Sequence, residues 1–303
     1  MFPTKNKIGW TTGEKTIWGK LYWRLKFLLT ESRGKNWDAI ICSLHSVITR
    51  GGKLAELLRK RNIIIWNKGA GFLKYKEKKF FYKGIPPVVD LIDIWMINEE
   101  YIARNFINNS AYKFSGSYER DGVLLEKGDY VIDAGANFGL FSILAGEKIG
   151  ESGIVYAFEP IIESHKLLLR NIHVNKVNNV KAIFKALGGN NNKIEFVIFN
   201  SLEGSSGYFQ GDFPKEKVDQ IRLDDFIKKN GIKKVDFIKA DIEGMERDLL
   251  LGAEEIIKKF HPKISICTYH RPDDPNILQK IIQNFIPEYK ILKTDSKLYA
   301  WVE

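Results

Sequence analysis

The stretch VIDAGANFGL, residues 131–140, decides the fold. Its apolar start, which ends at Asp133, predicts a buried strand, and the residues after the loop predict a helix. Between the two elements, Gly135 and Gly139 stand four positions apart with Asn137 between them. Ligands of an open parallel sheet bind beyond the carboxyl ends of its strands. This loop is therefore the first candidate for a ligand site.

The chain that follows this loop alternates apolar runs with helical patterns. Such alternation predicts a mostly parallel sheet with helices on both faces. The ending EYKILKTDSKLYAWVE, residues 288–303, predicts two strands around an Asp-Ser-Lys turn. Strands with no helix between them must pair antiparallel. This ending is unusual for a dehydrogenase and typical of a methyltransferase sheet.

Four local patterns give further expectations within the sheet domain. Residues 179–188 predict one strand, and residues 193–200 predict an extra strand. Residues 223–231 predict a short helix with an Asp cap and a Gly stop. The apolar stripe between Met245 and Ile257 predicts a single amphipathic helix.

The loop sequence also indicates which ligand it binds. A dinucleotide fold requires G-x-G-x-x-G so that the pyrophosphate meets a helix N-terminus. Here Asn137 replaces a glycine, which argues against a pyrophosphate. Glu159 ends the second strand, where an acid accepts hydrogen bonds from ribose hydroxyls. Such an acid fits NAD and S-adenosylmethionine alike, and the acid-rich loop favours the phosphate-free S-adenosylmethionine. The alternative is that the glycines only permit a tight turn.

Five segments between residues 120 and 303 resemble one known family. VIDAGANFGLFSILAG, VYAFEP, LDDFI, VDFIKADIEGMERDLLLGA and CTYHRPDD are similar to the FkbM-type S-adenosylmethionine-dependent methyltransferases, in the same order. The resemblance implies a class I (Rossmann-like) α/β methyltransferase fold, with a mostly parallel sheet and an antiparallel terminal strand. It also implies an O-methyltransferase for hydroxyls of sugars, glycolipids or polyketide-type natural products. We expect the cofactor to be held by Asp133, Gly135, Asn137, Gly139 and Glu159, with the backbone around Ala186 and Leu187 framing the adenine.

Methyl transfer to a hydroxyl needs an oxygen held in line with the leaving sulfur, and a base or metal to assist. Asp241 ends the fourth strand, and a strand period would place Glu243 on the same face. Alternatively, Asp241 binds the cofactor's amino group and Glu243 caps the next helix. His270 ends the fifth strand and is either a base or a loop histidine with a local hydrogen bond.

We predict Asp241, Glu243 and His270 as the catalytic residues. Together with Asp274 they could also ligate a divalent metal, but their spacing is too loose to assert one, and no metal ligand is assigned.

The charge of the 303-residue chain is uneven. Residues 1–115 hold 21 Lys and Arg against 9 Asp and Glu, whereas residues 116–303 hold 26 against 28. We therefore predict two parts: a smaller basic α/β module over 1–115 for accessory or recognition roles, and the methyltransferase domain over 116–303. The excess of positive charge in residues 1–115 suggests an anionic membrane, an anionic glycan or a nucleic acid as partner. The alternative is a solvated, lysine-rich surface.

Two motifs of the basic module allow several interpretations. Residues 17–30 place apolar and aromatic side chains on one helical face, which either lies in a membrane interface or docks on the other domain. Residues 74–84 interleave lysines with aromatics, which either stack bases or sugar rings or form an exposed edge strand. The functional alternatives are an RNA methyltransferase that uses this module, and a non-catalytic membrane- or glycan-binding protein with a relic methyltransferase fold. The sequence does not predict an oligomeric state.

The cellular environment is predicted from cysteine usage and the apolar runs. Cys42 and Cys267 are far apart and imply no disulfide framework. No secretory signal follows the first residues, and no run reaches the roughly 18 apolar residues of a membrane span. We expect a cytoplasmic protein, with peripheral membrane contact as an option.

Overall fold

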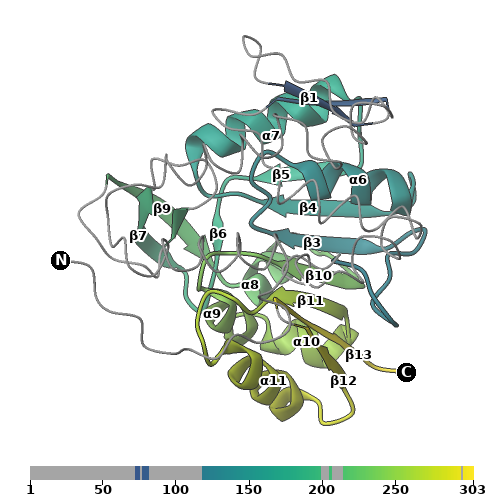
Figure 1. Cartoon of the computed structure of the whole chain (residues 1–303), viewed down its shortest axis with the longest axis vertical. Helices are drawn as coiled ribbons and strands as arrows, with labels where there is room; N and C mark the ends of the chain where they lie inside the picture. The colour runs from purple at the N-terminus through teal and green to yellow at the C-terminus, as the bar shows by residue number, and fades with distance from the viewer. Residues whose placement is uncertain (1–71, 76, 82–117, 199–204, 207–213, 295) are drawn as a thin grey trace, which may run out of the picture.

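A seven-stranded sheet forms the centre of the chain (Figure 1). The computed structural model describes residues 72–75, 77–81, 118–198, 205–206, 214–294 and 296–303. In spatial order, the strands are β12 Lys290–Lys293, β13 Lys297–Trp301, β11 Lys263–Cys267, β10 Phe237–Ala240, β3 Tyr130–Ala134, β4 Ile154–Phe158 and β5 Val180–Ile183. β13 pairs antiparallel with both β11 and β12, and the other four pairs of the sheet are parallel. The predicted parallel sheet with an antiparallel ending is confirmed.

The strand order reverses direction at β3. From β3 the chain builds β4 and β5 on one side of it, and then crosses back to place β10 and β11 on the other. The loops that follow β3 and β10 therefore leave the same edge of the sheet next to each other. This switch point is where an α/β sheet opens a crevice for a ligand.

Alternate strand residues face two apolar layers. Val131 and Phe237 point into the first layer, while Ile132 and Ile238 point into the second. The first layer includes side chains of α6 Leu140–Ile149 and α7 Ile162–Val174. The second includes side chains of α8 Leu223–Lys229, α9 Glu246–Leu251, α10 Glu254–Phe260 and α11 Asp274–Phe285. Both faces of the sheet are covered, as a parallel sheet requires.

A second sheet stands beside the first (Figure 1). It comprises β6 Ala186–Leu187, β9 Lys215–Ile221, β7 Asn192–Ile198 and β8 Ser205–Ser206, in that order. The extra strand predicted over 193–200 corresponds to β7. The single strand predicted over 179–188 is wrong, because the chain splits into β5 and β6. A tight turn, in which the amide of Lys185 donates to the carbonyl of Ile183 at 2.9 Å, sends β6 out of the main sheet to pair with β9.

The helix predicted between Met245 and Ile257 is also split, into α9 and α10. The break falls at Gly252, where a Cβ atom would lie 2.0 Å from the carbonyl oxygen of Gly188. This close approach of two backbones needs a glycine, which ends α9. The predicted apolar stripe itself is buried, since Leu249 and Ile257 are both fully inaccessible.

The aspartate cap predicted for α8 belongs to another helix. No side chain caps α8, which follows Arg222. The carboxylate of Asp224 instead accepts from the backbone amides of Ile256 at 3.0 Å and Glu255 at 3.3 Å, in the first turn of α10. The predicted glycine stop is present, because Gly231 follows α8 with a left-handed φ of 61°.

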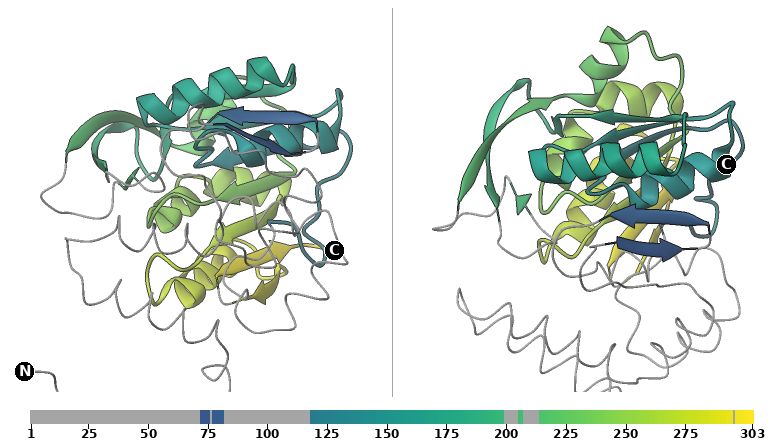
Figure 2. Two further views of the ribbon diagram at one scale, coloured as in Figure 1. Left: turned by 45° about the horizontal axis from the view of Figure 1, so that its top comes forward. Right: turned by 90° about the horizontal axis from the view of Figure 1, so that it is seen from above.

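A hairpin from the basic part packs on α7, as both views of Figure 2 show. Its strands, β1 Phe72–Tyr75 and β2 Lys78–Phe81, are antiparallel. The side-chain amides of Asn171 and Asn175 exchange hydrogen bonds with the β2 backbone at 2.6–2.8 Å. Phe80 is fully buried in the first apolar layer.

The rest of residues 1–115, including the predicted helix over 17–30, lies outside the described residues. The division into two parts at residue 115 stays a prediction. Among the residues that the structure describes, no helix is both long and apolar enough to cross a membrane.

Candidate active site

The loop after β3 is left-handed at three positions. The φ angles of Gly135, Asn137 and Gly139 are 80°, 51° and 90°. A Cβ atom at Gly135 would lie 1.9 Å from the backbone oxygen of Asp241, and one at Gly139 would lie 2.4 Å from Leu168. The left-handed backbone and these close contacts account for both glycines without a ligand, as the tight-turn alternative expects. The first contact fixes this loop against the residue that follows β10.

Glu159 joins the end of β4 to this loop. Its Oε2 accepts from the amide of Asn137 at 2.8 Å, and its Oε1 accepts from the amide of Ile161 at 2.9 Å. Burial raises the pKa of Glu159 to about 7, although the two amide hydrogen bonds oppose the shift. A carboxylate oxygen has two acceptor positions, so each oxygen can still accept from a hydroxyl. This pair of acceptor oxygens fits the two ribose hydroxyls of S-adenosylmethionine, which would donate to it.

Asp133 lies beneath the loop and is fully buried. Ser142 donates to one of its carboxylate oxygens, and Lys239 Nζ lies 2.9 Å from the other. Lys239 also donates to the carbonyl of Gly135 at 2.7 Å. Burial disfavours the lysine's charge, but Asp133 and Asp241 outweigh it and raise the pKa of Lys239. The pair ties the loop to β10, and a direct contact of Asp133 with the cofactor stays a prediction.

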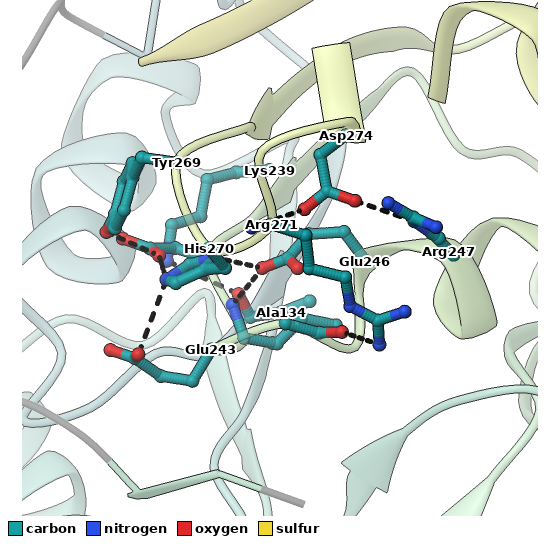
Figure 3. A network of polar contacts seen from close by, with 12 residues as sticks. Ala134, Lys239, Glu243, Glu246, Arg247, Tyr269, His270, Arg271 and Asp274 are labelled. Atoms are coloured by element: carbon teal, nitrogen blue, oxygen red, sulfur yellow. Dashed lines mark hydrogen bonds and ion pairs between the residues drawn. The ribbon is translucent and has the colours of Figure 1, made fainter. Parts of the chain in front are cut away.

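Three carboxylates surround the ring of His270 (Figure 3). Its Nε2 lies 3.6 Å from Asp241 Oδ1 and 3.4 Å from Glu243 Oε2, and its Nδ1 lies 3.0 Å from Glu246 Oε1. The structure thus brings the three predicted catalytic residues together. It does so by a turn, because β10 ends at Ala240 and Glu243 has a left-handed φ of 54°. The strand therefore does not persist as far as Glu243, which was the condition for placing the two acids on one face of it.

Asp241 accepts hydrogen bonds from two tyrosines. Tyr118 donates to Oδ2 at 2.8 Å, and Tyr269 donates to Oδ1 at 2.9 Å. Burial disfavours ionisation, but the positive charges of His270, Lys239 and Lys297 and the Tyr118 hydrogen bond lower the pKa of Asp241 below its usual value. Asp241 is therefore an ionised and weakly basic group.

The pKa values of His270 and Glu243 do not suit a histidine base. Burial disfavours the charged ring, yet Glu243, Glu246 and Asp241 outweigh it and raise the pKa of His270 to about 11. An imidazolium cannot accept a proton. Burial raises the pKa of Glu243, although His270 opposes the shift, and the Glu243 side chain keeps 27% of its surface exposed. Glu243 is the more basic and more accessible carboxylate.

The predicted adenine frame lies in the second sheet. Ala186 and Leu187 are buried in β6, where they pair with Gln220 and Ile221 of β9. Nothing in the structure tests their contact with adenine, which stays a prediction. Glu243 does not cap the next helix, because α9 follows Met245 and has no side-chain cap.

Comparison with models of known protein families identifies the family of this chain. The methyltransferase FkbM domain matches residues 133–290, more than half of the chain. The chain belongs to the FkbM methyltransferase family. The match includes every residue predicted for the cofactor and for the chemistry, and the resemblance inferred from the sequence is confirmed.

Individual relatives of this FkbM domain are distant. Methyltransferase 1 of Beauveria bassiana is 26% identical over 147 residues, 42% of this chain and 59% of that protein. Methyltransferase sdnD of Sordaria araneosa is 27% identical over 163 residues, 43% of this chain and 62% of that protein. The chain thus spans about three fifths of these relatives. The solved structure of methyltransferase FkbM from Methylobacillus flagellatus is 24% identical, with a TM-score of 0.46 over 60% of this chain and 46% of that one.

Sequence reasoning missed four residues of the FkbM site. Lys239 had a signal, since a charge inside an otherwise apolar buried strand needs a partner. Tyr269 and Glu246 are near predicted residues but had no pattern of their own. Tyr118 lies just after the predicted division at residue 115, so nothing local pointed to Asp241.

Asp274, the fourth residue of the metal set considered from sequence, is engaged elsewhere. Its Oδ1 lies 2.7 Å from Arg247 Nε, and its Oδ2 accepts from the amide of Arg271 at 3.1 Å. It belongs to the junction between α9 and α11 and is not among the acids around His270.

Proposed function

We propose that this chain is an S-adenosylmethionine-dependent O-methyltransferase for a hydroxyl of a glycan, glycolipid or natural-product-like small molecule. The observation that carries the proposal is the contact between the loop at Gly135 and the backbone of Asp241. It sets the predicted cofactor loop directly against the carboxylate cluster. A hydroxyl held at this cluster would lie next to the cofactor's reactive end.

The cofactor residues act as a frame for S-adenosylmethionine, which supplies an electrophilic methyl group when bound. Glu159 accepts from the ribose hydroxyls while its amide contacts hold the loop at Asn137. Lys239 and Asp133 keep the loop joined to β10 from below. Such preorganisation matters, because in-line transfer depends on the alignment of the acceptor oxygen with the methyl group and sulfur.

Glu243 is the group we assign to take the hydroxyl proton. Its raised pKa and partial exposure suit a general base, whereas Asp241 is held as a weakly basic carboxylate and His270 as a cation. The Asp241 carboxylate and its tyrosine donors then position the acceptor and keep His270 in place. Tyr269 is about half-exposed beside this cluster and offers a ring face to a sugar or another flat substrate.

The hairpin favours a small acceptor over RNA. The aromatics between the lysines of residues 74–84 were one candidate for base stacking. Phe80 is buried against the domain, and the Arg170 guanidinium covers the ring of Phe81 at 3.4 Å. Other residues of the chain thus cover the rings of Phe80 and Phe81, which weakens the interpretation that these rings stack on bases. Contact of the basic part with an anionic surface, and a cytoplasmic location, remain proposals on charge and composition alone.

Calorimetric titration with S-adenosylmethionine, with NAD as the control, tests the proposal. We expect S-adenosylmethionine alone to bind, in the micromolar range or tighter, after which glycan and lipid acceptors can be screened for methyl transfer. Binding of NAD instead, or of neither compound by folded protein, would overturn the assignment. An acceptor activity that collapses with salt would favour the RNA alternative, because nucleic-acid affinity falls steeply with ionic strength.

A further inference from the structure

We propose that Asp241, Glu246 and His270 bind a divalent metal ion of the manganese-to-zinc range. Each of the three residues offers one ligand atom, and these atoms all lie within 4.8 Å of one another. The residues come from two neighbouring strand ends and the first turn of α9, at the switch point of the sheet. Two atoms bound to one such ion at about 2.0–2.2 Å each lie about 3–4 Å apart, which is the range of the His270–Asp241 distance of 3.6 Å.

Buried atoms without hydrogen-bond partners point into this cluster. The His270 side chain is 3% exposed and that of Glu246 is fully buried. Among the described residues, neither ring nitrogen of His270 nor Oε2 of Glu246 has a hydrogen-bond partner of good geometry. Figure 3 shows the Glu246 carboxylate beside the His270 ring. Buried polar atoms are rarely left this way, and an ion is one of the explanations for such exceptions.

The charge of the cluster also favours a cation. Three carboxylates, those of Asp241, Glu243 and Glu246, meet around one ring, which is an imidazolium when no ion is bound. A divalent ion would take the place of the proton on the ligating nitrogen and bring one more positive charge. Lys239 compensates the charges of Asp133 and Asp241. Within the described part of the chain, Glu246 forms its one ion pair with His270. A buried carboxylate is costly unless a positive charge or a metal accompanies it.

The ligand types select the metal. One imidazole with carboxylates suits Mn²⁺, Fe²⁺ or Zn²⁺ better than Mg²⁺ or Ca²⁺, which prefer oxygen alone. The backbone amide of Ile242 donates to Glu246 Oε1 at 2.9 Å and orients that carboxylate. Glu243 Oε2 lies 3.4 Å from His270 Nε2, at the solvent-accessible edge of the cluster. It is not one of the three ligands and can still accept the proton of the acceptor hydroxyl. If the proposed function holds, an acceptor hydroxyl next to such an ion would ionise more readily.

Metal binding can be measured on the full chain without any acceptor. Protein freed of metal with a chelator is titrated with Mn²⁺ and followed by electron paramagnetic resonance, with Mg²⁺ as competitor. We expect one Mn²⁺ per chain with micromolar affinity, displaced by Zn²⁺ but not by equimolar Mg²⁺. Pulsed resonance should show the nitrogen coupling of one bound imidazole, a signature that a surface carboxylate site lacks. Absence of that coupling, or of binding by folded protein at about 1 mM Mn²⁺, would overturn the site.

Two variants locate the ion. Glu246→Gln keeps the acceptor for Ile242, and His270→Gln keeps a polar side chain, so both should fold. Each should weaken Mn²⁺ binding at least tenfold, whereas Glu255→Gln, an exposed glutamate of α10, should bind as wild type does. Equal binding in all three variants would place the ion elsewhere. If a variant does not fold, the wild-type nitrogen coupling decides.

Titration of the same samples with S-adenosylmethionine separates this proposal from the proposed function. Cofactor binding without Mn²⁺ binding removes only the metal site. Mn²⁺ binding without cofactor binding keeps the metal site and removes the methyltransferase role.

Discussion

The carboxylate of Glu159 accepts a hydrogen bond from the backbone amide of Asn137 at 2.8 Å. Two residues predicted separately for the cofactor are therefore one structural unit. Glu159→Ala removes both the acceptor for the ribose and the support of the loop. We expect the dissociation constant for S-adenosylmethionine to rise at least tenfold, since hydrogen bonds to a charged group contribute about 1.5–3 kcal/mol each. Calorimetry measures it, and Glu163→Ala on the exposed face of α7 is the matched control. An unchanged affinity in Glu159→Ala would remove the ribose assignment.

The raised pKa of Glu159 makes cofactor binding depend on pH. A carboxyl with a pKa of about 7 is mostly protonated at pH 6 and mostly ionised at pH 8. The ionised form is the better acceptor for ribose hydroxyls, so affinity should increase with pH and level off above the pKa. If only the ionised form binds, the gain between pH 6 and pH 8 is about tenfold. Titrations at pH 6, 7 and 8 measure it.

The cofactor's own amino group titrates near this range, so the variant provides the reference. Glu159→Ala should lose the part of the pH dependence that belongs to Glu159. A wild-type affinity that is flat with pH, or a slope retained in full by the variant, would contradict the role of this carboxylate.

Glu243→Gln should lower turnover and leave cofactor binding intact. The amide keeps the shape of the side chain but cannot take a proton. Loss of a general base typically costs about 10²–10⁴-fold in rate. Once an acceptor is known, kcat and the S-adenosylmethionine dissociation constant are measured on the same preparation. A variant with full turnover would exclude Glu243 as the base.

Asp241→Asn distinguishes the two roles that the sequence left open for Asp241. If the carboxylate positions the acceptor, kcat falls and cofactor affinity changes little. If it binds the cofactor's amino group, the dissociation constant of S-adenosylmethionine rises instead. The contacts of Asp241 with Tyr118, Tyr269 and His270 favour the first result.

The sequence predicted those parts of the site that follow from strand ends. Asp133, Glu159, Asp241 and His270 each follow or end an apolar run, and parallel strands bring such positions to one edge. Contacts that depend on a turn or on distant segments had no periodic signal. Tyr118 reaches Asp241 across 123 positions of the chain, and the turn at Glu243 needs a left-handed residue that no local pattern marks.

The capping aspartate was also assigned to the wrong helix, because its contact joins segments that are distant in sequence. Asp224 follows the local rule for a cap of α8, but its carboxylate reaches the first turn of α10. An aspartate next to the start of a helix identifies a capping side chain. Which helix it caps is decided by packing, and here α8 and α10 lie together in the second apolar layer.

Asp224→Ala should therefore destabilise the domain through α10. Loss of a capping carboxylate costs about 0.5–2 kcal/mol, and Asp224 is also buried and paired with Arg222 at 2.8 Å. The neighbouring Asp225 is the matched control, because its side chain is 46% exposed and its ion pair with Arg222 is longer, at 3.7 Å. Urea unfolding should give Asp224→Ala a loss of free energy of unfolding at the upper end of this range, and Asp225→Ala a loss below about 0.5 kcal/mol. Equal losses in the two variants would mean that the hydrogen bonds to Ile256 and Glu255 contribute no net stability to α10.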